Sequence, residues 1–118
     1  MRDVEPFTRD GTRIEVMMNA GLREDIRNLA AVGADGIGLF RTEYLFLNRK
    51  TWPSEEEQFE LYKKVAEKIK PQRASVRTLD LGADKLSDLI PHCLEANPAL
   101  GQRAIRYCLE HPEHFKPQ

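Results

Sequence analysis

Three arginines in this chain carry the residue chemistry that binds anions. Arg41 lies in the segment GLFRTE, Arg77 in VRTLD and Arg103 in GQRAIR. A guanidinium group is planar and always charged, and its N–H donors match the oxygens of a carboxylate or a phosphate two at a time. Arginine is also a common surface residue that usually faces water, so residue type alone leaves both interpretations open. The choice depends on which elements position the three side chains.

The chain alternates segments that are typical of strands with segments that are typical of helices. Short or alternating apolar runs predict strands over residues 12–18, 34–40 and 74–81. Helical spacing predicts helices over residues 22–32, 55–70 and 97–109. Gly33 stands where the first helix would end. The Asn97-Pro98 pair resembles the start of the third helix.

The second predicted helix has the clearest beginning. Ser54 and Glu57 have the spacing of a capping box, in which each side chain binds the backbone N–H of the other residue. Pro71 marks the end of this helix because proline cannot continue it. Its expected buried face consists of Phe59, Tyr62, Val65, Ala66 and Ile69.

The βαβαβα order predicts an α/β fold with a parallel sheet. Ligands in such folds bind beyond the carboxyl ends of the strands. Arg41 would end the second strand, Arg77 would lie late in the third, and Arg103 would open the helix that follows. Asn19, at the end of the first strand, could face the same place. The order therefore favours the anion-site interpretation.

Three βα units form either a small open sheet or part of a (β/α)₈ barrel, which needs about 250 residues. The third strand would have no partner on its outer edge before the sequence stops at Gln118, and such an edge is a liability. We therefore expect residues 1–118 to be an incomplete barrel domain, about the first three βα units of eight.

Composition narrows the class of protein. The 118 residues include 18 basic and 19 acidic side chains, so there is no basic excess of the kind that nucleic-acid binding requires. No apolar run approaches the roughly 20 residues of a membrane span, and the first residues lack a secretory signal. Cys93 and Cys108 have no framework spacing, which indicates reduced thiols. We expect a soluble cytoplasmic protein.

Three segments together resemble one family. GIGLFRTEYLF (residues 36–46), VRTLDLGADK (76–85) and EANPALGQRAIR (95–106) are similar to motifs of enzyme I of the bacterial phosphoenolpyruvate:sugar phosphotransferase system, in the same order. The wider family includes pyruvate phosphate dikinase and phosphoenolpyruvate synthase. The chain departs from the family pattern at Ala83, where a second glycine is frequent, and at Gln102, where tryptophan is frequent.

The resemblance implies a TIM-barrel domain that binds phosphoenolpyruvate and Mg²⁺. It implies transfer of the phosphoryl group to a histidine on another domain and then to a histidine phosphocarrier protein, in an enzyme that is a homodimer. By motif position, Arg41 and Arg77 match arginines that bind the substrate, and Arg103 matches one that faces the site. The phosphohistidine, the Mg²⁺ ligands and a catalytic cysteine would come from outside this chain. We therefore expect no catalytic residue and no bound cofactor here.

Several polar residues beside the arginines have two possible roles. Asp80 and Asp84 are carboxylates of the kind that Mg²⁺ binds. The resemblance favours a different role, in which they orient Arg77 and the neighbouring loops. By the same reasoning Glu43 would orient Arg41. Lys85 is a further supporting candidate.

One other group of side chains could bind a metal ion. Cys108, His111 and His114 are three residues apart, which is compatible with zinc ligation. However, Pro112 interrupts the helix between them, and a fourth ligand is not evident. We interpret the histidines as solvated side chains and expect no metal-binding residue in this chain.

Three functions remain open from the sequence. The first is part of a phosphoenolpyruvate–protein phosphotransferase that would be inactive alone. The second is part of a dikinase or a phosphoenolpyruvate synthase. The third is a non-catalytic module that binds an anion or mediates oligomerisation.

Overall fold

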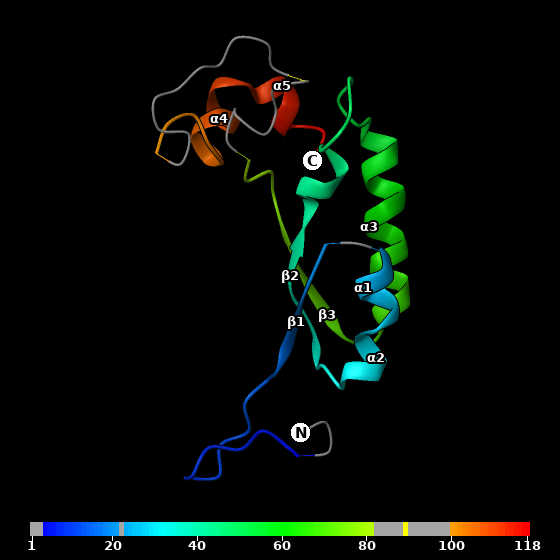
Figure 1. The fold of residues 1–118 in the computed structure, drawn as a ribbon, viewed down its shortest axis with the longest axis vertical. Helices are drawn as coiled ribbons and strands as arrows, with labels where there is room; N and C mark the ends of the chain where they lie inside the picture. The colour runs from blue at the N-terminus through cyan, green and yellow to red at the C-terminus, as the bar shows by residue number, and fades with distance from the viewer. Residues whose placement is uncertain (1–3, 22, 82–88, 90–99) are drawn as a thin grey trace.

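The computed structural model describes residues 4–21, 23–81, 89 and 100–118. Its centre is a parallel sheet of three strands in the order β1-β2-β3 (Figure 1). The strands are β1 (Met17–Ala20), β2 (Gly36–Arg41) and β3 (Arg73–Arg77). The predicted α/β class with a parallel sheet is therefore confirmed for these three strands.

The helices lie in two places. Helices α1 (Arg23–Arg27), α2 (Leu29–Val32) and α3 (Glu55–Ile69) lie on one side of the sheet (Figure 1). The short helix η1 (Thr42–Leu45) follows β2 directly, and α4 (Ile105–Glu110) and α5 (Pro112–Phe115) lie beyond the carboxyl ends of the strands. Within the described ranges no helix is long and apolar enough to cross a membrane.

Two separate clusters of buried residues hold these elements together. The first lies between the sheet and the helices on its covered side, and contains Ala20, Ile26, Ala34, Ile37, Phe40, Val65 and Ile69. The second lies beyond the strand ends, and contains Phe46, Leu79, Leu81, Tyr107 and Cys108. The chain is consequently elongated, with a radius of gyration of 17.2 Å. A compact chain of this length would have about 13.5 Å.

Helix α3 begins as predicted, but part of its buried face was predicted wrongly. The Glu57 N–H donates to Ser54 Oγ at 3.2 Å, and the Ser54 N–H donates to Glu57 Oε2 at 2.9 Å, which completes the capping box. Val65 and Ile69 are buried, but Phe59 is 53% exposed and Ala66 is also exposed.

Gln58 occupies a buried position on α3, which its polar side chain did not predict. It is 2% exposed. Its amide N–H group donates to the carbonyl of Pro53 at 3.4 Å, and its amide oxygen accepts from the Tyr62 hydroxyl at 3.3 Å. Burial is tolerated because these bonds replace those with water.

The strands differ in length from the prediction. The first strand was expected over residues 12–18, whereas β1 spans Met17–Ala20, and within residues 12–16 Arg13 makes an isolated antiparallel bridge with Phe7. The third was expected to reach residue 81, but β3 ends at Arg77. Arg77 pairs with Arg41, and β2 turns into η1 at Thr42, so the ladder has no partner for residues beyond Arg77.

Two helices also differ from the prediction. The helix expected over residues 22–32 is divided at Asn28 into α1 and α2, and Gly33 follows α2 with a φ of 70°, as expected of a helix end. The helix expected over residues 97–109 corresponds to α4, which begins at Ile105. Ala104, directly before it, has a positive φ of 50°. Arg103 therefore precedes this helix and does not open it. Asn97 and Pro98 lie outside the described residues.

Candidate functional site

The carboxyl ends of β2 and β3 bring two of the predicted arginines together. Arg41 and Arg77 are the last residues of these strands, and their Cα atoms are register partners in the parallel ladder. Paired residues of neighbouring strands direct their side chains to the same face of a sheet. The predicted placement of both arginines at strand ends is confirmed.

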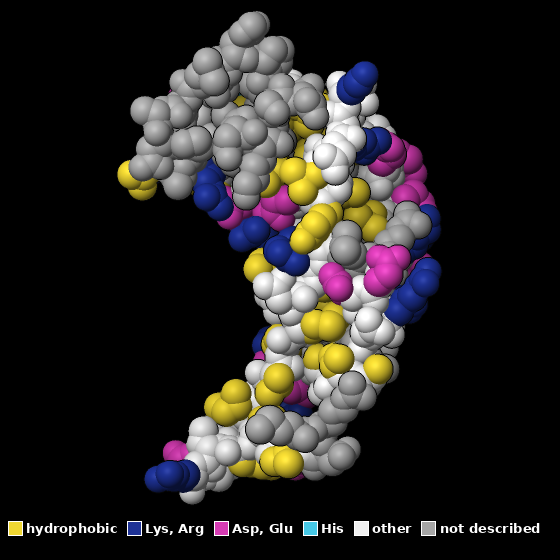
Figure 2. Space-filling view, in the orientation of Figure 1, with side chains coloured by type: hydrophobic (Ala, Val, Ile, Leu, Met, Phe, Trp, Pro, Cys, Tyr) yellow, Lys and Arg dark blue, Asp and Glu magenta, His cyan; other side chains and the backbone are white. Residues whose placement is uncertain are grey.

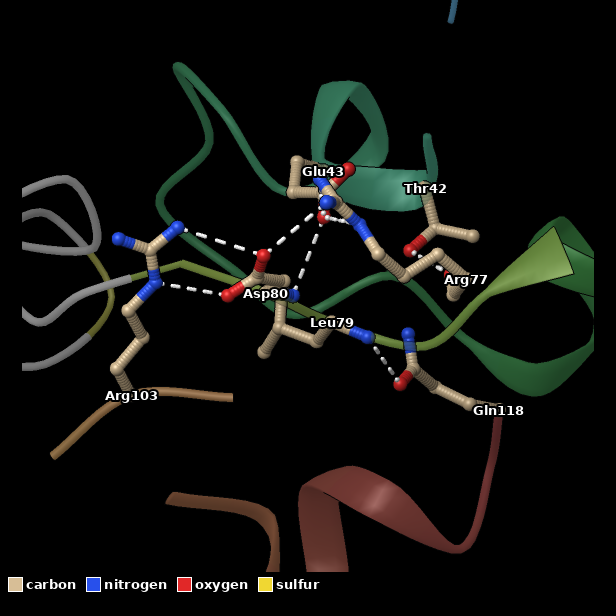
Figure 3. A network of polar contacts seen from close by, with 7 residues as sticks. All are labelled: Thr42, Glu43, Arg77, Leu79, Asp80, Arg103 and Gln118. Carbon is tan, nitrogen blue, oxygen red and sulfur yellow. Dashed lines mark hydrogen bonds and ion pairs between the residues drawn. The ribbon is translucent and has the colours of Figure 1, made fainter. Parts of the chain in front are cut away.

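Arg77 is held by a buried carboxylate. Its Nε and Nη2 atoms lie 2.9 Å and 2.7 Å from Oε1 of Glu43, whose side chain is 7% exposed (Figure 3). The Thr42 hydroxyl donates to the backbone carbonyl of Arg77 at 2.9 Å. Sequence analysis had assigned Glu43 to Arg41, and that assignment is wrong. The reason is that η1 turns the chain directly after Arg41 and directs Glu43 towards β3.

Asp80 links Arg77 to Arg103. Its Oδ2 lies 3.1 Å from Nη1 of Arg77. Its Oδ1 and Oδ2 accept from Nε and Nη2 of Arg103 at 2.8 Å and 3.3 Å, a two-point pairing (Figure 3). The Asp80 backbone N–H also donates to Oε1 of Glu43 at 3.2 Å. Glu43, Arg77, Asp80 and Arg103 therefore form one continuous polar network.

The C-terminal residue supports the same loop. The Leu79 backbone N–H donates to Oε1 of Gln118 at 3.0 Å (Figure 3). Leu79 itself is buried in the second core cluster, beside the residues of α4. The segment between Arg77 and Asp80 is thus fixed both by apolar packing and by the side chain of Gln118.

Arg41 is not part of this network. Its guanidinium carbon lies 5.0 Å from the centre of the Tyr44 ring, a cation–π contact. Its Nε is buried and has no hydrogen-bond partner among the described residues. Arg41 also lines an open cavity of about 520 Å³ between η1 and the start of α3, which includes Arg49 and Glu57. A buried donor without an acceptor is uncommon and calls for an explanation.

The arginine side of the site has an excess of positive charge. Glu43 and Asp80 balance the charges of Arg77 and Arg103 within the described network, and Arg41 at the neighbouring strand end carries one further positive charge. The side chains of Arg77 and Arg103 are 36% and 42% exposed, and both pair with Asp80. In the space-filling view, basic and acidic side chains meet on the hollowed side of the molecule (Figure 2). The arrangement suits a small anion.

The remaining predicted residues divide into two groups. Asp84 and Lys85 lie outside the described residues. Asn19 is an exposed residue of β1, and no hydrogen bond in the described part of the chain joins it to the network. Sequence analysis missed Thr42, Tyr44 and Gln118. Thr42 and Tyr44 are neighbours of Arg41 in the same motif, which was a usable signal, whereas nothing in the sequence indicated Gln118.

The histidines near the C-terminus are not simply solvated, contrary to expectation. His114 stacks on Trp52 with ring centroids 3.8 Å apart, and its Nδ1 lies 2.7 Å from the Tyr107 hydroxyl oxygen. Burial lowers the pKa of His114 and raises that of Cys108. Cys108 is 3% exposed and belongs to the second core cluster, so it does not join the histidines.

Comparison with known proteins gives a consistent result. The family described as PEP-utilising enzyme, PEP-binding domain, matches residues 1–118. Proteins named phosphoenolpyruvate-protein phosphotransferase from Staphylococcus carnosus and Staphylococcus epidermidis are 49% and 48% identical over 118 residues. One from Bacillus sp. is 45% identical over 111 residues, which is 94% of this chain and 19% of that protein. The two staphylococcal matches cover all of this chain and 21% of each relative, so it spans about a fifth of their length.

Proposed function

This chain belongs to the PEP-binding domain family of PEP-utilising enzymes, and on that premise we propose that the protein containing it is a phosphoenolpyruvate–protein phosphotransferase. In the proposed reaction, phosphoenolpyruvate gives its phosphoryl group to a histidine on another domain. That group then passes to a histidine phosphocarrier protein of a cytoplasmic sugar-uptake system. The family match and the names of the relatives support this reaction, and both protein partners lie outside the chain.

The observation that carries the proposal is the pairing of Arg77 and Arg103 through one carboxylate at the carboxyl end of the sheet. Asp80 lies within 3.1 Å of both guanidinium groups and so fixes their spacing. Phosphoenolpyruvate carries a phosphate and a carboxylate, and guanidinium groups bind both in a two-point manner. Asp80 holds two arginines close together, and phosphoenolpyruvate presents two anionic groups close together. The two arginines therefore suit this substrate.

The same groups would assist the transfer step. When the phosphorus–oxygen bond of phosphoenolpyruvate breaks, the phosphoryl group bonds to the histidine nitrogen and negative charge develops on the enolate oxygen. Protonation of the enolate at its methylene carbon then yields pyruvate. Phosphoryl transfer depends on positioning and on stabilisation of such charge. Arg77 and Arg103 are already oriented by Glu43 and Asp80, so they would stabilise this charge with little rearrangement.

Arg41 would complete the site by moving. Its buried Nε has no acceptor among the described residues, while its backbone is the register partner of Arg77. We propose that substrate binding draws the guanidinium group of Arg41 from the Tyr44 ring to the anion. The exchange replaces a weak cation–π contact with a charge-assisted hydrogen bond, which is the stronger interaction.

The sheet would be completed by further βα units into a (β/α)₈ barrel, in an enzyme that forms a dimer. The exposure of β3 supports the barrel: Val76 on this strand is 48% exposed, and β3 pairs only with β2 among the described strands. An unpaired strand edge is normally covered. Dimer formation is a prediction from the resemblance to the family.

The described carboxylates beside the arginines are Glu43 and Asp80, and both are engaged by guanidinium groups. Oε1 of Glu43 and both carboxylate oxygens of Asp80 pair with guanidinium groups, whereas Mg²⁺ requires carboxylates that are open to the ion and its waters. In the described part of the chain we therefore assign no ligand to Mg²⁺. The proposed enzyme would hold that ion with other residues.

The proposal is tested by replacing two arginines of one strand in the full-length protein. Arg77 ends β3, whereas Arg73 begins it and pairs with the exposed Glu15. We expect Arg77→Ala to lower kcat/KM for phosphotransfer from phosphoenolpyruvate by about 10²-fold or more, by analogy with the loss of one charge-stabilising donor. Arg73→Ala should change kcat/KM less than about twofold.

The readouts separate the competing functions. Equal activity of the Arg77→Ala and Arg73→Ala variants would exclude the arginine site. Phosphotransfer activity that requires ATP and pyruvate, and does not require the phosphocarrier protein, would identify a dikinase or synthase. Binding of phosphoenolpyruvate without any transfer by the full-length protein would indicate a non-catalytic module. Circular dichroism of each variant checks that the fold is kept.

A further inference from the structure

A second cluster of polar side chains lies on the C-terminal helices. His111, Glu113 and His114 each place one candidate ligand atom within 4.8 Å of those of the other two. All three lie at the junction of α4 and α5, and Pro112 makes the turn between the helices. From this geometry we propose that His111, Glu113 and His114 bind a divalent transition-metal ion of the zinc class. This site is independent of the proposed phosphotransfer.

The first argument is the spacing of two ligands. His111 Nδ1 and Glu113 Oε1 are 3.2 Å apart. Zinc binds nitrogen and oxygen ligands at about 2.0–2.2 Å in a tetrahedron, which places two ligand atoms about 3.3–3.5 Å apart. The two atoms therefore already have nearly the separation that an ion between them would require. An ion would replace a contact between partly exposed side chains.

The second argument is the fixed orientation of His114. The ring stacks on Trp52 with planes 13° apart, and the Tyr107 hydroxyl is bonded to its Nδ1. Metal-binding histidines commonly use their second nitrogen in a hydrogen bond of this kind, which sets the tautomer and the ring orientation. Because the Tyr107 hydroxyl is bonded to Nδ1 of His114, Nε2 is the ring nitrogen that would bind the metal. Stacking on Trp52 occupies a face of the His114 ring, whereas a metal binds in the plane of the imidazole.

The third argument is the chemistry of the ligands. Two imidazoles and one carboxylate favour Zn²⁺, Ni²⁺ or Cu²⁺, whereas Mg²⁺ prefers a set of oxygen ligands. Three protein ligands leave one tetrahedral position for water or for a fourth group. The sequence pattern of a histidine pair three residues apart pointed to Cys108 as the third ligand. The structure replaces the buried Cys108 with Glu113, which is exposed.

The test is a titration of the full-length protein with Zn²⁺ in excess Mg²⁺, which occupies sites with oxygen ligands. We expect binding of one ion that His111→Ala weakens at least tenfold and Glu113→Gln weakens several-fold. His92→Ala is the matched control, since His92 is the one other histidine of the chain, and it should leave the affinity unchanged. Circular dichroism and thermal unfolding of each variant check the fold.

A second readout locates the ion. Cu²⁺ bound to His114 should quench the fluorescence of Trp52, because the two rings are in contact. The quenching at stoichiometric Cu²⁺ should disappear in Trp52→Phe, in which Zn²⁺ binding is expected to remain. Zinc binding that is absent in the wild type, unchanged by His111→Ala or equally weakened by His92→Ala would overturn the proposal. Quenching that persists in Trp52→Phe would place the ion elsewhere and would also overturn it.

Discussion

Arg41 and Arg77 are register partners at the carboxyl ends of β2 and β3, and their side chains make different contacts. Arg77 is fixed by Glu43 and Asp80, whereas Arg41 rests on Tyr44 and its Nε has no hydrogen-bond partner within the described ranges. One strand pair therefore provides one oriented arginine and one that needs only a side-chain rotation to meet an anion.

Asp80 sets the spacing of Arg77 and Arg103, so its replacement should affect activity more than stability. We expect Asp80→Asn to lower kcat/KM for phosphotransfer by about tenfold or more, because misplaced groups lose much of their effect on a transition state. The free energy of unfolding should fall by less than about 1 kcal/mol, since both ion pairs are partly exposed. Steady-state kinetics and urea unfolding measure the two quantities.

A control for Asp80 exists elsewhere on the surface. Asp35 pairs with Arg13 at 2.5 Å, and neither residue lies at the carboxyl end of the sheet. Asp35→Asn should leave kcat/KM unchanged. If Asp80→Asn retained full activity, the carboxylate would have no positioning role.

Glu43 should matter for stability because it is buried. Its Oε1 accepts from the Arg77 side chain and from the backbone N–H of Asp80. Glu43→Gln removes the charge that faces Arg77 and replaces one oxygen with a donor, and we expect a loss of about 1–3 kcal/mol in the free energy of unfolding. Chemical denaturation gives the value. Glu60→Gln, which alters an exposed pair with Lys64, should change stability by less than about 0.5 kcal/mol.

Elements with a strong local pattern were predicted correctly from the sequence. Predictions were wrong where contacts between distant residues determine the structure. The capping box of Ser54 and Glu57 is a local pattern, and it fixed the start of α3. The end of β3 depends on where β2 stops, which no pattern within residues 74–81 reveals. Gln58 reads as an exposed polar residue, yet hydrogen bonds to Pro53 and Tyr62 allow its burial.

The site shows the same division. Arg41, Arg77 and Arg103 were chosen by residue type and by family resemblance, and the structure places Arg77 and Arg103 on one carboxylate. The partner of Glu43 was predicted wrongly, because the helix η1 begins directly after Arg41 and directs Glu43 towards β3. The contact between Gln118 and the Leu79 backbone joins residues that are 39 positions apart, and no sequence pattern predicted it.

The cap of α3 offers a direct test of local stability. Ser54→Ala removes the acceptor for the Glu57 N–H, and we expect a loss of about 1 kcal/mol in the free energy of unfolding. Ser75→Ala, at an exposed position of β3, is the control and should change stability by less than about 0.5 kcal/mol. Thermal or urea unfolding measures both. Equal losses in the two variants would contradict a capping role.

Cys108 should be an unreactive thiol whose protonation depends on the fold. Burial raises its pKa above the ordinary value of 9.0, which keeps the reactive thiolate form scarce at neutral pH. We expect its alkylation by iodoacetamide at pH 8, followed by peptide mass spectrometry, to be at least tenfold slower in the folded protein than in urea. Equal rates would show that the side chain is accessible.

The raised pKa of Cys108 also has a consequence for stability. The folded state holds this proton more tightly than the unfolded state, so its contribution is complete below pH 9.0 and is lost as the pH rises through the folded-state pKa. Stability of the wild type should therefore decline more steeply above pH 9 than that of Cys108→Ala. Cys108→Ala also leaves a small cavity, which lowers stability at every pH. The comparison consequently rests on the slope against pH and not on the absolute value. Parallel slopes would show that the thiol titrates alike in both states.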